Sequence, residues 1–234
     1  MISKGLPTIV LVHGAWHGGW CWQRLTPQLV KRGFVCRTVD LPSVGARAGE
    51  TVGLSADAAT VRAAVARISG PVILCAHSYG GMVISMAAAG APQVQQLVYV
   101  CAYVPESGQS VTDIRGGKRL PWVQKLDGGM TMADAERAAP LLYGGCDAAT
   151  QQWAIRQLRP QCNAAFEERI GTPGWKEVPS TYVICASDQV IAPDLQREVL
   201  APRTTHVVEI DSGHSPFLSM PAQLAEAMSL QPGR

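Results

Sequence analysis

The chain has 234 residues, of which 47% are hydrophobic and 16% are charged, with 23 Gly and 16 Pro. This composition excludes a disordered chain and a coiled coil. The formal net charge of +2 gives no electrostatic footprint for nucleic acid. At this length, one elaborated domain or one domain with an insertion can bury a core without disulfides or a metal.

Short apolar, β-branched runs alternate with segments of helical spacing along the chain. The runs predict strands at residues 8–13, 34–39, 71–76, 97–101, 181–185 and 206–210. The spacing predicts helices at residues 22–31, 55–68, 82–89, 194–200 and 222–230. Pro27 is expected to kink or delay the first helix, and Ser55 is expected to be the N-cap of the second. The alternation predicts an α/β fold with a mainly parallel sheet of about six strands flanked by helices.

Residues 106–177 interrupt this alternation. They contain no convincing strand, and helices are expected at 131–138 and 148–158. An insertion of about 70 residues is too long for a plain loop. We interpret it as a helical cap (lid) on a core made of residues 1–105 and 178–234. The alternative is a peripheral helical decoration.

Localisation signals and cysteines point to an ordinary cytoplasmic protein. The first residues pass into an apolar strand without a cleavage-site pattern, so no signal peptide is expected. Residues 68–105 lack charges, but Gly, Pro, His and Gln interrupt them, which favours buried strands and a buried helix over a membrane span. The seven cysteines form no CxxC pair and are expected to be reduced. We expect no membrane or nucleic-acid partner, and the sequence permits a homodimer.

A glycine-rich motif, His13-Gly14-Ala15-Trp16-His17-Gly18-Gly19-Trp20, follows the first strand. Such a turn can direct the Ala15 N–H at an oxyanion, as acyl transfer requires. The alternative is a plain tight turn. His13 and His17 have an i, i+4 spacing, but the intervening glycine and the absence of a third ligand argue against a metal site.

The strongest pattern is Ala76-His77-Ser78-Tyr79-Gly80, which connects a strand to an apolar helix. It matches the nucleophile elbow G-x-S-x-G, with Ala76 in place of the first Gly. Small residues are needed two positions before and after the serine, because the backbones crowd there. The Tyr79 N–H, at the helix N-terminus, would be the second oxyanion donor. Otherwise, Ser78 would be a helix N-cap.

A base and an acid follow the last two predicted strands. His214 is in the loop after the final strand, and Asp188 follows the preceding strand. Ser78, Asp188 and His214 therefore all lie beyond the carboxyl ends of parallel strands, where catalytic groups collect. The acid could instead be one of three residues with local explanations. These are Asp40 in a turn, Asp211 as a loop-shaping residue and Asp194 as a helix cap. His77 is expected to point to the other side of the turn and to have a packing role or to support the catalytic residues.

The quoted motifs, together with Ala186-Ser187-Asp188 and Gly213-His214-Ser215-Pro216-Phe217, resemble those of α/β-hydrolases. The resemblance is to the branch that holds hydroxynitrile lyases, plant methylesterases and small bacterial carboxylesterases, and also to pyrethroid-hydrolysing esterases. It covers about two thirds of the chain. It implies a cofactor-free serine hydrolase that cleaves a carboxylic ester of small to medium hydrophobic size through an acyl-enzyme.

Two departures from this branch bear on the reaction. Gly14 stands where the cyanogenic lyases carry Thr, and Ser215 stands where they carry Lys, which argues against lyase chemistry. C–C bond or thioester cleavage, and a ligand-binding protein with a low-turnover triad, remain alternatives. The cap would supply the substrate pocket. Its candidate residues are Trp122, Leu141, Leu142, Tyr143 and Trp153, with Ala15 and Tyr79 at the base of the pocket. Gly14 is a further candidate for substrate binding.

Overall fold

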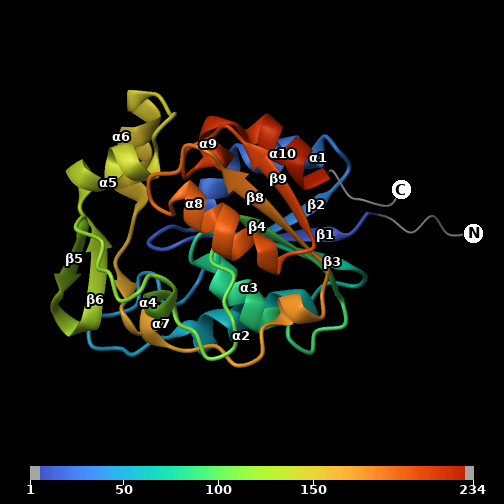
Figure 1. Ribbon diagram of the computed structural model, residues 1–234, viewed down its shortest axis with the longest axis horizontal. Helices are drawn as coiled ribbons and strands as arrows, with labels where there is room; N and C mark the ends of the chain where they lie inside the picture. Colours follow the sequence, from blue (N-terminus) through green and yellow to red (C-terminus); the bar gives the residue numbers. More distant parts are fainter. Residues whose placement is uncertain (1–5, 230–234) are drawn as a thin grey trace, which may run out of the picture.

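Six parallel strands form the central sheet of the computed structural model, which describes residues 6–229 (Figure 1). Their spatial order is β2 (Val35–Val39), β1 (Thr8–Val12), β3 (Val72–His77), β4 (Val94–Val100), β8 (Ser180–Cys185) and β9 (His206–Ile210). Each neighbouring pair is parallel. All six predicted strands are confirmed, and their ends differ by at most three residues.

Burial explains the long uncharged stretch of the sequence. Every residue of β3 and all but one residue of β4 are buried, whereas the edge strands β2 and β9 are largely exposed or half-buried. Helix α3 (Gly80–Ala88) is buried on nearly every side. Interior strands and a helix covered all round require apolar side chains without charge. The prediction of two buried strands flanking a buried helix is therefore confirmed.

The flanking helices form two layers. Helices α1 (Leu25–Val30) and α10 (Pro221–Ser229) pack together on one face of the sheet, and α2 (Leu54–Ala66) packs with α3 on the other (Figure 1). Helix α1 begins only at Leu25, after a 3₁₀ turn at Gly19–Gln23. This start agrees with the delay expected from Pro27, which fits only in the first turn of a helix. The predicted last residue of α10, at position 230, lies outside the described residues.

Two expected helix caps are wrong. Helix α2 begins after Gly53, and the Ser55 hydroxyl instead donates to the Glu168 carboxylate. Asp194 lies inside α8 (Pro193–Leu195), whose N-cap is Ala192. Proline at the first helical position displaces the cap by one residue. The predicted helix at 194–200 then continues as a π-helical segment, Gln196–Leu200, and α9 (Pro216–Ser219) follows β9.

The segment between β4 and β8 is not purely helical, which corrects the prediction for residues 106–177. It contains an antiparallel sheet of β5 (Val123–Leu126), β6 (Met130–Ala133) and β7 (Gln161–Cys162). The predicted helix at 131–138 is a strand in its first half, and α5 (Ala135–Leu142) begins after the Asp134 cap. The hairpin turn at Asp127–Gly129 includes Gly128 at φ +67°, and Asp-Gly is a hairpin signal that the helical interpretation overlooked.

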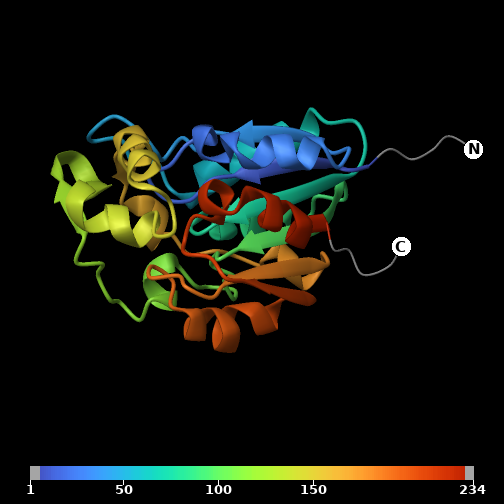
Figure 2. The ribbon, with the colours of Figure 1, turned by 90° about the horizontal axis from the view of Figure 1, so that it is seen from above.

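The remaining helices of this segment are short. They are α4 (Val111–Ile114), α6 (Ala148–Gln157) and α7 (Ala164–Glu167), and α6 confirms the helix expected at 148–158. Figures 1 and 2 place α5, α6, β5 and β6 beyond one end of the central sheet. We refer to residues 106–177 as the insertion.

All seven cysteines are free thiols, and five of them are buried, which confirms the expected reduced state. Within residues 6–229, none of the helices combines the length and the apolar character that crossing a membrane requires.

Candidate active site

Ser78 occupies a sharp turn between β3 and α3. Its φ is +52°, a left-handed conformation that is rare for a residue with a Cβ. Three hydrogen bonds of the Ser78 backbone hold the turn. Its amide donates to the Val100 carbonyl at 3.3 Å, and its carbonyl accepts the amides of Gly81 and Tyr103, each at 3.1 Å. Helix α3 begins at Gly80 with Tyr79 at the N-cap, so Ser78 is not a helix cap. The elbow predicted from the sequence is confirmed.

Crowding around the elbow explains its small residues. A Cβ on Gly80 would lie 2.7 Å from the His13 carbonyl oxygen and 3.3 Å from the Ala76 Cβ. A Cβ on Gly14 would lie 2.6 Å from Nδ1 of His77 and 3.0 Å from the Ser78 Cβ. These contacts are too short for a side chain unless neighbouring atoms shift, which close packing resists. Gly14 and Gly80 therefore allow the close approach of the turn and the elbow.

Asp188 and His214 meet although they are 26 residues apart. Nδ1 of His214 lies 2.8 Å from Oδ2 of Asp188, and both side chains are almost completely buried. The other Asp188 oxygen accepts the amides of Val190 and Ile191, at 2.7 and 3.1 Å. Gln196 donates to Oδ2 at 3.0 Å. This set of donors holds the carboxylate in one orientation, so the imidazole is fixed in turn.

The three competing carboxylates have other contacts. Asp40 accepts the Gly19 amide at 2.7 Å, and Asp211 accepts the Ser187 hydroxyl at 3.0 Å. Asp194 is 86% exposed and lies 3.7 Å from Arg197. Among these acids, therefore, only Asp188 is hydrogen bonded to His214.

Ser78 and His214 line the same cavity, which has a volume of about 30 Å³. Within residues 6–229, the Ser78 hydroxyl has no hydrogen-bond partner, so its link to His214 is not formed in this state. Hydrogen bonds of this kind are often long in unliganded enzymes and tighten when substrate binds. The cavity is small, so a bulky ligand would need more room than this state offers.

Only some of the residues predicted to bind substrate line the cavity. Trp122 and Leu142, from the insertion, line it together with Ala15 and Tyr79. Tyr143 is buried outside the lining, where its hydroxyl contacts Nε2 of His17 at 2.9 Å. Trp153 also lies outside the lining and packs edge-on against Trp20, with ring centroids 5.2 Å apart.

The Ala15 and Tyr79 amides are available to a ligand. Neither donates a hydrogen bond to any group within the described part of the chain, residues 6–229. Both residues line the cavity with Ser78. Unpaired backbone N–H groups at a helix start and a glycine-rich turn are suited to bind a negatively charged oxygen.

His13 and His17 are buried and hydrogen bonded through both ring nitrogens. Nδ1 of His13 lies 2.8 Å from the Gly14 carbonyl, so it donates, and Nε2 accepts the Leu41 amide at 3.0 Å. Nδ1 of His17 donates to the Ala15 carbonyl at 2.6 Å, and Nε2 faces the Tyr143 hydroxyl. Burial lowers the pKa of His13 to about 4 and that of His17 to about 3. Both are neutral residues that shape the turn.

His77 is closer to the site than the sequence predicted. Its ring lines the cavity, and its centroid lies 4.5 Å from that of His214. Nε2 of His77 donates to the His214 carbonyl at 2.8 Å, and the Cys101 thiol approaches the same carbonyl at 3.3 Å. Burial lowers the pKa of His77 well below its ordinary value. The hydrogen bond to the His214 loop agrees with the packing or supporting role expected for His77, although its ring also borders the cavity.

A buried polar network joins the elbow to the insertion. Asp57 of α2 is fully buried and accepts the Ser43 hydroxyl and the Tyr79 hydroxyl, each at 2.6 Å. Gln161 donates to the Ser43 hydroxyl at 3.0 Å and accepts the Trp16 amide at 3.0 Å. Burial raises the pKa of Asp57. The network thus connects the turn at Trp16, the insertion and the residue after Ser78.

Sequence reasoning missed this network and several residues that line the cavity. Asp57 stands three residues after Leu54 and four before Val61, both buried in α2, and this spacing places it on the apolar face. Trp16, Arg115 and Phe166 line the cavity. Trp16 lies within the glycine-rich motif, but no pattern in the sequence identifies the other two residues, because the path of the insertion decides their positions.

Comparison with known proteins finds related sequences and structures over nearly the whole chain. The family model for the alpha/beta hydrolase family matches residues 9–227 of this chain. A carbendazim-hydrolysing esterase from Nocardioides sp. (strain SG-4G) is 32% identical, and the alignment covers 96% of this chain and 99% of the relative. Methyl jasmonate esterase 1 from Vitis vinifera is 27% identical, with 92% of each chain covered. The crystal structure of a pyrethroid hydrolase from Sphingobium faniae JZ-2 superimposes with a TM-score of 0.84 at 27% identity, covering 95% of this chain and 96% of that one.

Proposed function

The chain belongs to the alpha/beta hydrolase family, and from this membership we propose that it hydrolyses a carboxylic ester through an acyl-enzyme formed on Ser78. Esterase relatives over nearly the whole chain support this assignment. The observation that carries it is the buried Asp188–His214 pair, which opens on the same cavity as a serine at φ +52°.

Each member of the proposed triad has a defined role. The Ser78 hydroxyl attacks the ester carbonyl while Nε2 of His214 takes its proton. The imidazolium that forms is stabilised by Asp188, which holds Nδ1 at 2.8 Å and so leaves Nε2 free to face the serine. His214 then protonates the leaving alcohol. In the second half-reaction it activates a water molecule that releases the acid.

We assign the oxyanion hole to the Ala15 and Tyr79 amides. Their freedom from other hydrogen bonds supports this role. The Asp57 network helps to position both donors. Asp57 accepts the Tyr79 hydroxyl, and Gln161 of the same network accepts the Trp16 amide, next to Ala15. A donor pair that is oriented before the reaction stabilises the tetrahedral intermediate without reorganisation.

We further propose that residues 106–177 act as a cap that encloses the substrate. Trp122, Leu142 and Phe166 from this segment line the cavity, with Trp16 from the core. Trp16 packs edge-on against Trp122, with ring centroids 5.5 Å apart. These apolar walls fit a hydrophobic acyl or alcohol group.

Ester turnover by a Ser78→Ala variant tests the proposal. We expect wild-type protein to hydrolyse p-nitrophenyl butyrate, and Ser78→Ala to lose that activity while it keeps the wild-type circular dichroism spectrum. Wild-type protein treated with a fluorophosphonate should gain one adduct, on Ser78. Undiminished turnover by the variant would refute the role of Ser78. An adduct without turnover of any ester would favour a ligand-binding protein over an esterase.

A further inference from the structure

A second cavity adjoins the site cavity and is rich in basic side chains. It has a volume of about 140 Å³ and lies between α4, β5, β6 and α7. Four residues line both cavities, namely Trp16, Arg115, Leu120 and Phe166. Because these four residues border both spaces, the second cavity lies directly beside the site.

The charges that line this second cavity are unbalanced. Its basic residues are Arg115, Lys118, Arg119 and Lys125, and its one acidic residue is Glu167. The Glu167 carboxylate accepts a hydrogen bond from the Asn163 amide at 2.6 Å. None of the ion pairs within residues 6–229 includes any of the four basic residues. The whole chain has a net charge of only +2, so the excess is a local feature.

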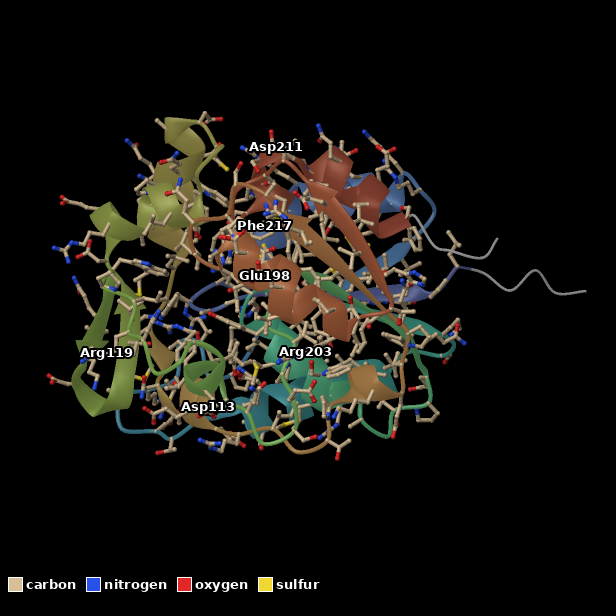
Figure 3. The ribbon with its side chains drawn as sticks, viewed as in Figure 1. Asp113, Arg119, Glu198, Arg203, Asp211 and Phe217 are labelled. Carbon is tan, nitrogen blue, oxygen red and sulfur yellow. The ribbon has the colours of Figure 1, made fainter. Side chains whose placement is uncertain are left out.

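Arg115 is the residue that connects this charge to the site. It is half-buried and lines the site cavity together with Ser78 and His214. Its guanidinium donates to the Lys118 carbonyl at 2.6 Å, which leaves its other N–H groups without a carboxylate partner. Figure 3 shows Arg119 at the end of the molecule that the insertion forms, beside β5 and β6. Arg115 therefore borders the site cavity and also belongs to the basic lining of the second cavity.

We infer that the ester substrate carries a carboxylate on the arm that occupies this second cavity. The inference rests on the proposed esterase function and names its substrate class. A guanidinium binds a carboxylate through two parallel hydrogen bonds, and unpaired cations along a cleft attract anions to it. The shared apolar walls, Trp16, Leu120 and Phe166, would contact the part of the substrate between the ester and the carboxylate.

Matched pairs of esters test this inference. Mono-p-nitrophenyl glutarate and p-nitrophenyl pentanoate have the same acyl length and differ in the terminal carboxylate. 4-Carboxyphenyl butyrate and phenyl butyrate place the same difference on the alcohol. We expect at least one charged ester to have a kcat/KM about tenfold or more above that of its neutral partner. Because the attraction is electrostatic, this ratio should fall when the salt concentration is raised to about 0.5 M.

Substitutions assign the preference to the cavity. Arg115→Gln should bring the charged-to-neutral ratio of kcat/KM close to one, and the triple variant Lys118→Gln, Arg119→Gln, Lys125→Gln should lower it. The matched control is Arg67→Gln, an exposed arginine after α2 without an ion pair, which should keep the wild-type ratio.

Two results would overturn the inference. One is a wild-type ratio near one for both pairs, and the other is a high ratio that survives Arg115→Gln and the triple variant. Hydrolysis of the neutral esters that depends on Ser78 would in either case leave the esterase function intact. Failure to hydrolyse any of the four esters would instead contradict the esterase function itself.

Discussion

Acidification from pH 7 to pH 5 should destabilise this protein, because it buries neutral histidines. His13 and His17 each use one ring nitrogen as a donor and have the other facing an N–H or O–H group. Protonation would turn that second nitrogen into a donor as well and would place a charge where water is excluded. Burial accordingly lowers the pKa of His13 to about 4 and that of His17 to about 3, from 6.5. In the unfolded chain both would be protonated at pH 5.

The size of the effect follows from these pKa values. A group whose pKa is lowered on folding contributes stability above its unfolded pKa and loses it as the pH falls toward the folded value. At pH 5, protonation of each histidine in the unfolded chain lowers the free energy of unfolding by about 2 kcal/mol, or about 4 kcal/mol for the two together. Burial also lowers the pKa of His77, which adds in the same direction. This loss is a large part of an ordinary stability of about 5–15 kcal/mol.

Urea unfolding, followed by tryptophan fluorescence at pH 7, 6 and 5, measures this dependence. The free energy of unfolding should fall steadily over the series. His17→Gln should reduce the slope, whereas His206→Gln, at the half-exposed start of β9, should keep it. Burial raises the pKa of Asp57, which acts in the opposite direction, but the variants share Asp57 with the wild type, so the differences isolate the histidines. A wild-type stability that stays constant from pH 7 to pH 5 would refute the reasoning.

Three further predictions concern the elbow and its supports. Asp188→Asn should lower kcat by about 10⁴-fold without loss of fold, because an amide favours the wrong imidazole tautomer, and a decrease of less than tenfold in p-nitrophenyl ester turnover would contradict the triad. Gly80→Ala should cost about 1–3 kcal/mol in urea unfolding, because its Cβ would lie 2.7 Å from the His13 carbonyl oxygen, and unchanged stability would show that the elbow relaxes. Asp57→Ala should cost about 3 kcal/mol, because it leaves the buried Ser43 and Tyr79 hydroxyls without an acceptor. Tyr79→Phe, which removes one of those donors, should cost less, and the reverse order would argue against the network.

The sequence determined the core of this protein largely through local patterns. The six strands of the main sheet are short apolar runs separated by helices, and strands buried on both faces allow few other interpretations. The elbow was equally predictable, because its small residues and the strand and helix that flank it are contiguous in the sequence. Since parallel strands end at one edge of the sheet, the order of Ser78, Asp188 and His214 was enough to expect that they meet there.

Only the tertiary structure decided what surrounds these residues. The strands β5, β6 and β7 of the insertion are short, and β7 pairs with a strand about 30 residues earlier. No alternation of polar and apolar residues within these segments therefore predicts this sheet. The link between Asp57 and Gln161 joins positions that are 104 residues apart through Ser43, and the position of Arg115 between two cavities depends on the path of the insertion. Side-chain periodicity predicts which face of an element is buried, but contacts between distant irregular segments depend on how the whole chain packs.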